Sequence, residues 1–169
     1  MKRLWLGLVF FVAFPASAAW LKLDKSADGL LFQGAEDGEP FAFNVPGTSV
    51  RTAKDGNRAF AEIDGVLVQV MLVPVPPSAA ADPAGGFMVS EQRYLESAGA
   101  SIVPSSVCSG LHGPHSEWAS SVGGHLTRYL ATTAGKRLLV VTVVASNPNV
   151  PESAAADVFA SVCSSLKVA

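Results

Sequence analysis

The chain has 169 residues, of which 49% are hydrophobic and 15% are charged, and its formal net charge is -2 at pH 7. This composition is too apolar for a disordered chain and suits one compact domain of ordinary size. The mild acidity, without any basic run, argues against nucleic acid and anionic membrane surfaces as partners.

Residues 1–18 have the pattern of a cleaved secretory signal peptide. A positive start (MKR) precedes the apolar stretch Leu4–Phe14, and the letters ASA at 16–18 match the small-residue cleavage pattern. A membrane anchor is the alternative, but the stretch is shorter than the ~20 apolar residues that span a bilayer. Cleavage removes two cations and no anion, which takes the formal charge from -2 to -4. We therefore expect a periplasmic or extracellular protein, with residues 19–169 as a single domain that has no membrane span.

The first half of the mature chain predicts two hairpins, because in each case a turn signal separates two apolar stretches. Their arms and turns are residues 29–33, Asp37-Gly38 and 41–45, then 59–63, Asp64-Gly65 and 66–73. Alternation in the first hairpin puts Phe41, Phe43 and Val45 on one face, which we assign to the core. The last arm, VLVQVMLV, is apolar at both alternating sets of positions apart from Gln69, so we expect it inside a sheet.

A proline-, alanine- and glycine-rich segment, residues 75–86, predicts a surface loop before a helix. The helix is predicted over Phe87–Ala98, because apolar residues recur there at helical spacings. These residues are Phe87, Tyr94, Leu95 and Ala98. Residues 101–109 then predict a strand, and Pro104 inside it indicates an edge or a bulged strand.

The run Arg137–Ala145, RLLVVTVVA, predicts the central strand of the sheet, since a strand covered on both faces is apolar throughout. Residues 115–120 read as a short strand. Residues 125–133 favour a strand paired with the central run, and a helix is the alternative because Leu126, Tyr129 and Leu130 have helical spacing. Pro151 suits the first turn of a closing helix. The buried face of that helix is Ala155, Val158, Phe159, Val162, Cys163 and Leu166.

The two cysteines of the chain, Cys108 and Cys163, both belong to the mature protein. In an oxidising compartment they predict a disulfide, and the alternative is two separate buried thiols. The segment between them is long, so such a bridge stabilises the fold by about 4 kcal/mol through the entropy of the unfolded chain.

Three segments, PFAFNVPG at 40–47, RLLVVTVVAS at 137–146 and DVFASVCSSLKV at 157–168, carry a resemblance to the PsbP-like and DcrB-like domains. The resemblance implies an α+β fold, with an antiparallel sheet of about six strands and helices packed on it as an α/β/α sandwich. Members of that family are mostly non-catalytic accessory proteins. It therefore implies a secreted or periplasmic, non-enzymatic accessory domain that binds a protein or an envelope component.

Metal binding is the alternative function, and it rests on His112, His115 and His125, which fall within one short region. The H-x-x-H spacing of the first two suits Zn or Cu, and Glu117 is a candidate carboxylate ligand. Solvated loop histidines have the same pattern, so spacing alone decides nothing. Trp118, in the same region, is a candidate for an exposed binding surface. No G-x-S-x-G elbow, calcium loop or phosphate-binding loop occurs in the sequence, which favours a protein without catalysis and without another cofactor.

Overall fold

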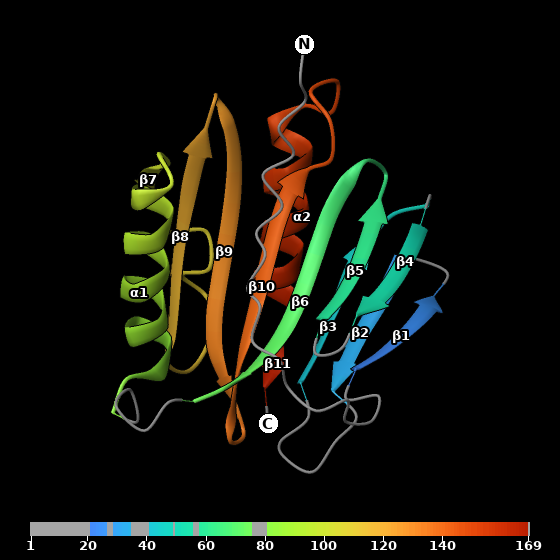
Figure 1. Ribbon diagram of the computed structural model, residues 1–169. Coiled ribbons are helices and arrows are strands. Elements are labelled where there is room, and N and C mark those ends of the chain that lie inside the picture. Colours follow the sequence, from blue (N-terminus) through green and yellow to red (C-terminus); the bar gives the residue numbers. More distant parts are fainter. Residues whose placement is uncertain are drawn as a thin grey trace.

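The computed structural model describes residues 21–26, 29–34, 41–48, 50–55, 58–75 and 81–168. In these residues the chain forms eleven strands and two helices (Figure 1). In chain order they are β1 (Leu21–Ser26), β2 (Gly29–Gly34), β3 (Phe41–Pro46), β4 (Val50–Asp55), β5 (Arg58–Ile63), β6 (Val66–Pro74), α1 (Pro83–Ser97), β7 (Ser101–Pro104), β8 (His115–Val122), β9 (His125–Ala134), β10 (Arg137–Ala145), α2 (Glu152–Ser165) and β11 (Lys167–Val168). The predicted signal peptide and the Asp37-Gly38 turn lie outside the described residues.

The strands form two sheets, and every pairing in the described residues is antiparallel. The larger has the order β4-β5-β6-β10-β9-β8-β7, and the smaller has the order β1-β2-β3-β11. β10 is the middle strand of the larger sheet, which confirms the prediction for Arg137–Ala145. β9 pairs with β10 from Ala134 back to Thr127, so residues 125–133 form a strand and the helical alternative is wrong.

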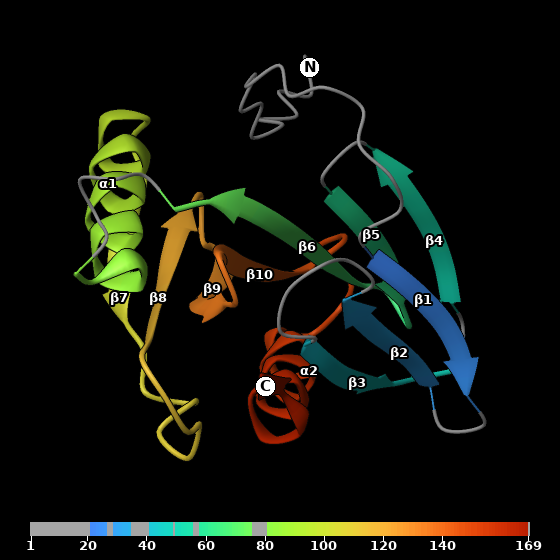
Figure 2. The ribbon, with the colours of Figure 1, turned by 90° about the horizontal axis from the view of Figure 1, so that it is seen from below.

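Figure 2 shows the layers: α1 lies on one side of the larger sheet, and α2 lies on the other side beside the smaller sheet. α1 packs on β7, β8 and β9, whereas α2 packs on β10, β6 and β3. The prediction of an antiparallel α+β fold is confirmed. The prediction of one sheet of about six strands is wrong, because the first hairpin forms a separate sheet that covers the larger one.

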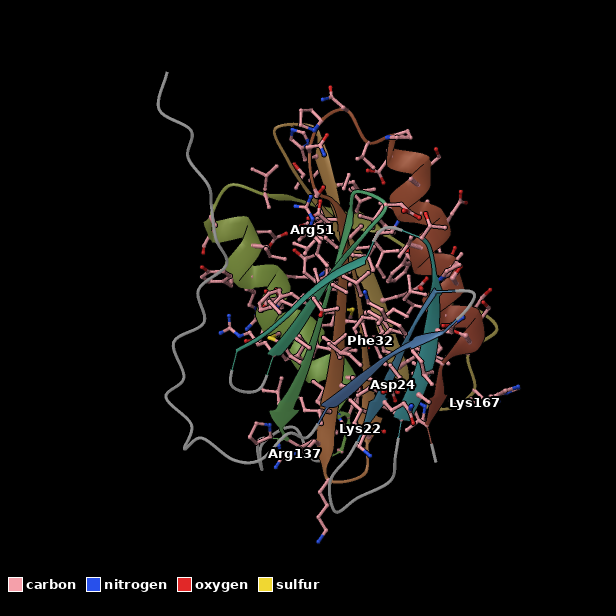
Figure 3. All side chains as sticks on the ribbon, turned by 90° about the vertical axis from the view of Figure 1, so that its right-hand side faces the viewer. Lys22, Asp24, Phe32, Arg51, Arg137 and Lys167 are labelled. Carbon is pink, nitrogen blue, oxygen red and sulfur yellow. A yellow bond between two sulfur atoms is a disulfide. The ribbon has the colours of Figure 1, made fainter. Side chains whose placement is uncertain are left out.

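The aromatic residues of the smaller sheet explain why it packs face to face on the larger one. Alternation in β3 buries Phe41, Phe43 and Val45, as predicted, and Phe32 of β2 stacks on Phe43 with ring centroids 4.7 Å apart. Phe32 lies in the middle of the molecule (Figure 3). Burial of these three phenylalanine rings removes a large apolar area from water and stabilises the face-to-face packing.

β10 is apolar on both sides because both of its sides are buried, though by different elements. Leu139 and Val141 belong to the main core between the two sheets and α2, and each has an exposed fraction of 0%. Leu138 and Val140 belong to a second core under α1. The prediction that both faces of this strand are covered is thus confirmed for its first half. Further along, Thr142 and Val144 face the α1 side and are only half-buried.

The second hairpin turns at the predicted residues. Asp64 and Gly65 both have positive φ, 48° and 83°, which is the backbone of the two-residue turn that matches the twist of paired strands. Gly65 also packs closely against the segment that precedes α2, because a Cβ at this position would come within 2.6 Å of Val150 Cγ2. The turn therefore fixes the β5–β6 register, in which Ile63 pairs with Val66.

α1 begins at Pro83, four residues before the predicted start, so the part of the predicted loop from Pro83 to Gly86 is helical. Asp82 is the N-cap, and its carboxylate accepts a hydrogen bond from the Gly85 N–H at 3.0 Å. Proline is favoured at the first helical position because its missing N–H costs nothing there. Neither of the two helices in the described residues is long and apolar enough to cross a membrane.

Candidate functional site

The predicted disulfide is present and joins two segments that meet at one edge of the main core. Cys108 lies in the loop between β7 and β8, and Cys163 lies in the last turn of α2. Their Cα atoms are 5.0 Å apart, and both residues are buried, with exposed fractions of 1% and 7%. The described residues contain no free cysteine, so the alternative of two separate thiols is wrong.

Two hydrogen bonds hold the loop that carries Cys108. The Leu111 N–H donates to the Cys108 carbonyl at 2.8 Å and closes a turn at the disulfide. Further on, the Thr132 hydroxyl of β9 donates to the Pro114 carbonyl at 2.9 Å. These bonds and the disulfide fix the loop against the sheet and against α2.

A cavity of about 600 Å³ lies between this loop and the end of α2, and we call it the disulfide pocket. Apolar side chains from both segments form most of its walls. They are Val107, Leu111, Ala160, Leu166 and Val168. His112 and the cationic Lys167 also line it, and neither side chain forms an ion pair with a described residue. Lys167 lies at the outer margin of the molecule (Figure 3).

Glu117 stands behind the disulfide. It pairs with Leu130 across β8 and β9, so its side chain faces the α2 side of the sheet. One carboxylate oxygen, Oε2, accepts the Cys108 N–H at 2.7 Å. The other, Oε1, is buried without a hydrogen-bond partner, a situation that costs on the order of 1–3 kcal/mol. A carboxylate oxygen and both Sγ atoms lie within 4.8 Å of one another.

The three histidines proposed as metal ligands do not share a centre. His112 lines the disulfide pocket, and the Nδ1 of His115 lies 3.0 Å from the Gly113 carbonyl oxygen. His125 is paired with Val122, at the opposite end of β8 from His115. Seven residues of extended strand separate those ends by roughly 23 Å. The Zn or Cu site predicted from His112, His115 and His125 is therefore wrong in its ligand set.

Trp118 is not an exposed binding surface, and that prediction is wrong. Its exposed fraction is 1%, because it faces α1 and stacks on Tyr129 with ring centroids 5.0 Å apart. Phe87 of α1 also packs against it, with the ring centroids 6.2 Å apart. Adjacent residues of a strand point to opposite sides, so Trp118 and Glu117 belong to different cores.

The core under α1 holds a small group of buried polar side chains. Burial raises the pKa of Glu91, whose exposed fraction is 4%. Burial is also the main cause that raises the pKa of Tyr129, and the nearby Glu91 charge adds to it. The Tyr129 hydroxyl lies 3.1 Å from that of Ser120. None of these three residues lines the disulfide pocket or the smaller cavity between the starts of β9 and α2.

Comparison of the sequence with known proteins found no family model that matches the chain and no match among curated proteins. The candidate site is therefore supported only by the positions and contacts of its residues in this structure. The sequence predicts Glu117 as a carboxylate ligand, but as a partner of the histidines. Its position on β8, on the face that also carries buried Leu130, is the signal that could have directed it towards Cys108.

Proposed function

We propose that this protein is a secreted or periplasmic, non-enzymatic accessory domain that binds an envelope component, and that the disulfide pocket is its binding site. A volume of about 600 Å³ falls within the range of small-ligand sites. The walls are mostly apolar and carry few polar groups, which is the usual composition of such sites.

The disulfide favours a binding role because it holds both walls of the pocket in place before any ligand arrives. Cys108 belongs to one wall and Cys163 to the other. Binding to a site that is already ordered costs less conformational entropy than binding to one that must be ordered. The rigid pocket thus supports binding of a ligand with a defined shape.

The ligand that fits this pocket best has an apolar chain and one anionic group. Val107, Leu111 and Leu166 offer the contact for an acyl chain. The Lys167 ammonium offers a cationic partner for a carboxylate or phosphate head, and the His112 ring N–H offers a hydrogen-bond donor. An acyl anion released from, or anchored in, the envelope has this chemistry. A protein segment that inserts an apolar side chain is the competing occupant.

The compartment and the family are parts of the same proposal. The MKR start, the apolar stretch and the ASA sequence support export, and an intramolecular disulfide is compatible with an oxidising compartment. The resemblance to PsbP-like and DcrB-like domains rests on the sequence segments at 40–47, 137–146 and 157–168, and an antiparallel α+β fold is compatible with it. That resemblance implies an accessory role without catalysis.

The first test is a calorimetric titration of residues 19–169 with decanoate and with decanol, in the oxidised state. We expect saturable one-to-one binding of decanoate and weaker binding of decanol, which lacks the charge. Val107→Asp should weaken decanoate binding roughly tenfold or more, because it puts a like charge on an apolar wall. Lys167→Gln should reduce the difference between the two ligands.

A matched control is Val122→Asp. Val122 is exposed to 46% and Val107 to 44%, but Val122 lies at the far end of β8, away from the pocket. This variant should bind decanoate as the wild type does. Absence of decanoate binding to the wild type, or equal loss in both variants, would contradict the proposed ligand. If Val107→Asp instead abolishes cross-linking to one envelope protein, the occupant is a protein segment.

A further inference from the structure

Three ligand atoms of a kind that proteins use for metals meet at the back of the disulfide pocket. They are the Sγ atoms of Cys108 and Cys163 and a carboxylate oxygen of Glu117, all within 4.8 Å of one another. They come from three separate elements: the loop before β8, the end of α2, and β8 itself. Cys163 is 55 residues from Cys108, so the fold and not a short sequence motif brings the three ligands together.

The oxidised state leaves one oxygen of the Glu117 carboxylate unsatisfied. Glu117 Oε2 accepts the Cys108 N–H, but Oε1 is buried and has no partner. The neighbouring disulfide carries no proton, so it has nothing to donate to this oxygen. Buried polar atoms nearly always have a partner, and an exception calls for an explanation. A cation bound between the sulfur atoms and Oε1 would supply that partner.

We propose that reduction of the Cys108–Cys163 disulfide creates a Zn²⁺ site formed by the two thiolates and the Glu117 carboxylate. Thiolate ligands select zinc over the harder cations calcium and magnesium, and zinc also accepts carboxylate oxygen. In a tetrahedral site with Zn–S bonds of about 2.3 Å, the two sulfur atoms lie ~3.8 Å apart. Cα atoms 5.0 Å apart allow this separation by side-chain rotation once the S–S bond is broken.

The fourth position of the site faces the disulfide pocket and is open to water. Cys108 and Cys163 both line that cavity, whereas Glu117 lies behind them. Three protein ligands and one water make a site in which the metal can exchange. The disulfide and the metal exclude each other, so the redox state decides whether the site exists.

The reaction that opens the site balances with a dithiol as the reductant. The dithiol gives two electrons and two protons to the S–S bond and becomes a disulfide, and Cys108 and Cys163 become thiols. Zn²⁺ then displaces the two thiol protons, which leave to solvent. Two thiolates, one carboxylate and the dication give the bound site a net charge of -1.

The test is a zinc titration of residues 19–169, metal-free and reduced with a phosphine, in competition with a chromophoric chelator. We expect one Zn²⁺ per reduced chain and none in the oxidised protein. Glu117→Gln should weaken zinc binding at least tenfold, because it removes the charged oxygen ligand. His125→Ala, at the start of β9 and opposite Val122, is the matched control and should bind zinc as the wild type does.

The proposal would be overturned if the reduced protein stays folded, as judged by far-UV circular dichroism, and shows no saturable zinc binding. Equal zinc affinity in Glu117→Gln and the wild type would overturn it too. If reduction unfolds the protein, zinc should restore the folded spectrum, since metal binding then drives folding. Failure of zinc to restore it would also count against the site. Decanoate binding by the oxidised protein is unaffected by any of these outcomes.

Discussion

At the residue scale, Glu91 shows how burial changes the chemistry of one side chain. It lies on the inner face of α1 with an exposed fraction of 4%, and burial raises its pKa above the ordinary value of about 4.5. The folded state therefore favours the protonated carboxyl. Stability from this group is fully present below the ordinary pKa and falls as pH rises through the raised pKa.

Glu91→Gln should remove this pH dependence, because the amide resembles the neutral carboxyl and does not titrate. Near pH 4 the variant and the wild type should unfold at similar urea concentrations. At pH 8 the variant should be more stable, by about 1.4 kcal/mol for each unit by which folding raises the pKa. Urea unfolding followed by far-UV circular dichroism at a series of pH values measures the difference.

The control for this comparison is Glu96→Gln, an exposed position on the same helix. It should have little effect at either pH, since surface substitutions usually change stability by less than 0.5 kcal/mol. A wild type that gains stability from pH 5 to pH 8 relative to Glu91→Gln would contradict the assignment.

The residues of the candidate site were predicted unevenly, for a physical reason. Cys108 and Cys163 were predicted as partners because two cysteines allow only one pairing. The sequence does not show which side of the sheet Trp118 and Glu117 face. The preceding loop contains several turn residues, so the position at which the alternation of β8 begins cannot be read from the sequence. A shift of one residue in that phase exchanges the two sides of the sheet. The histidines were grouped by sequence distance, and the extended β8–β9 hairpin places His115 and His125 at opposite ends.

At the element scale, the start of α1 depends on Asp82. Its carboxylate accepts the Gly85 N–H, and Pro83 follows at the first helical position. Asp82→Ala removes the side-chain acceptor and should destabilise the protein by ~1 kcal/mol. Thermal unfolding and amide hydrogen exchange in the first turn of α1 would measure the loss. Ser90→Ala, exposed in the middle of the helix, should leave exchange in that turn unchanged.

The elements with a strong apolar periodicity were predicted well. The first turn of α1 and the edge strand β4, which lack such a periodicity, were not. The hairpin arms, the central strand and α2 have clear apolar repeats, and all of them are present. The first turn of α1 was assigned to a loop because glycine and proline dominate it. β4 was not predicted, since VRTAKD has no apolar alternation and forms an edge strand only by pairing with β5. Sequence patterns also do not say which sheet a strand joins.

At the scale of the whole molecule, the two sheets and α2 share one core, so a large cavity in it should affect the entire fold. Phe43 is exposed to 1% and packs between Phe32 and Phe41. Phe43→Ala should destabilise the protein by roughly 3–5 kcal/mol. The measurement is the urea midpoint, with an unchanged slope as the sign that the protein still unfolds as one unit.

Phe60→Ala is the matched control, since Phe60 of β5 is only half-buried. It should cost clearly less than Phe43→Ala. If Phe43→Ala produced two separate unfolding transitions, the smaller sheet would be an independent unit and the shared core would be disproved.

The position of β10 in the larger sheet also bears on how the chain reaches its native state. Its partner β6 lies far earlier in the sequence, with Leu139 opposite Leu72, and α2 packs against β3 from the first hairpin. Neither half of the chain can therefore bury its core before the other half is present. Contacts between such distant segments require large loops to close first, which slows folding. Until β10 arrives, β6 exposes an unpaired apolar edge, so the nascent chain depends on protection from aggregation for most of its synthesis.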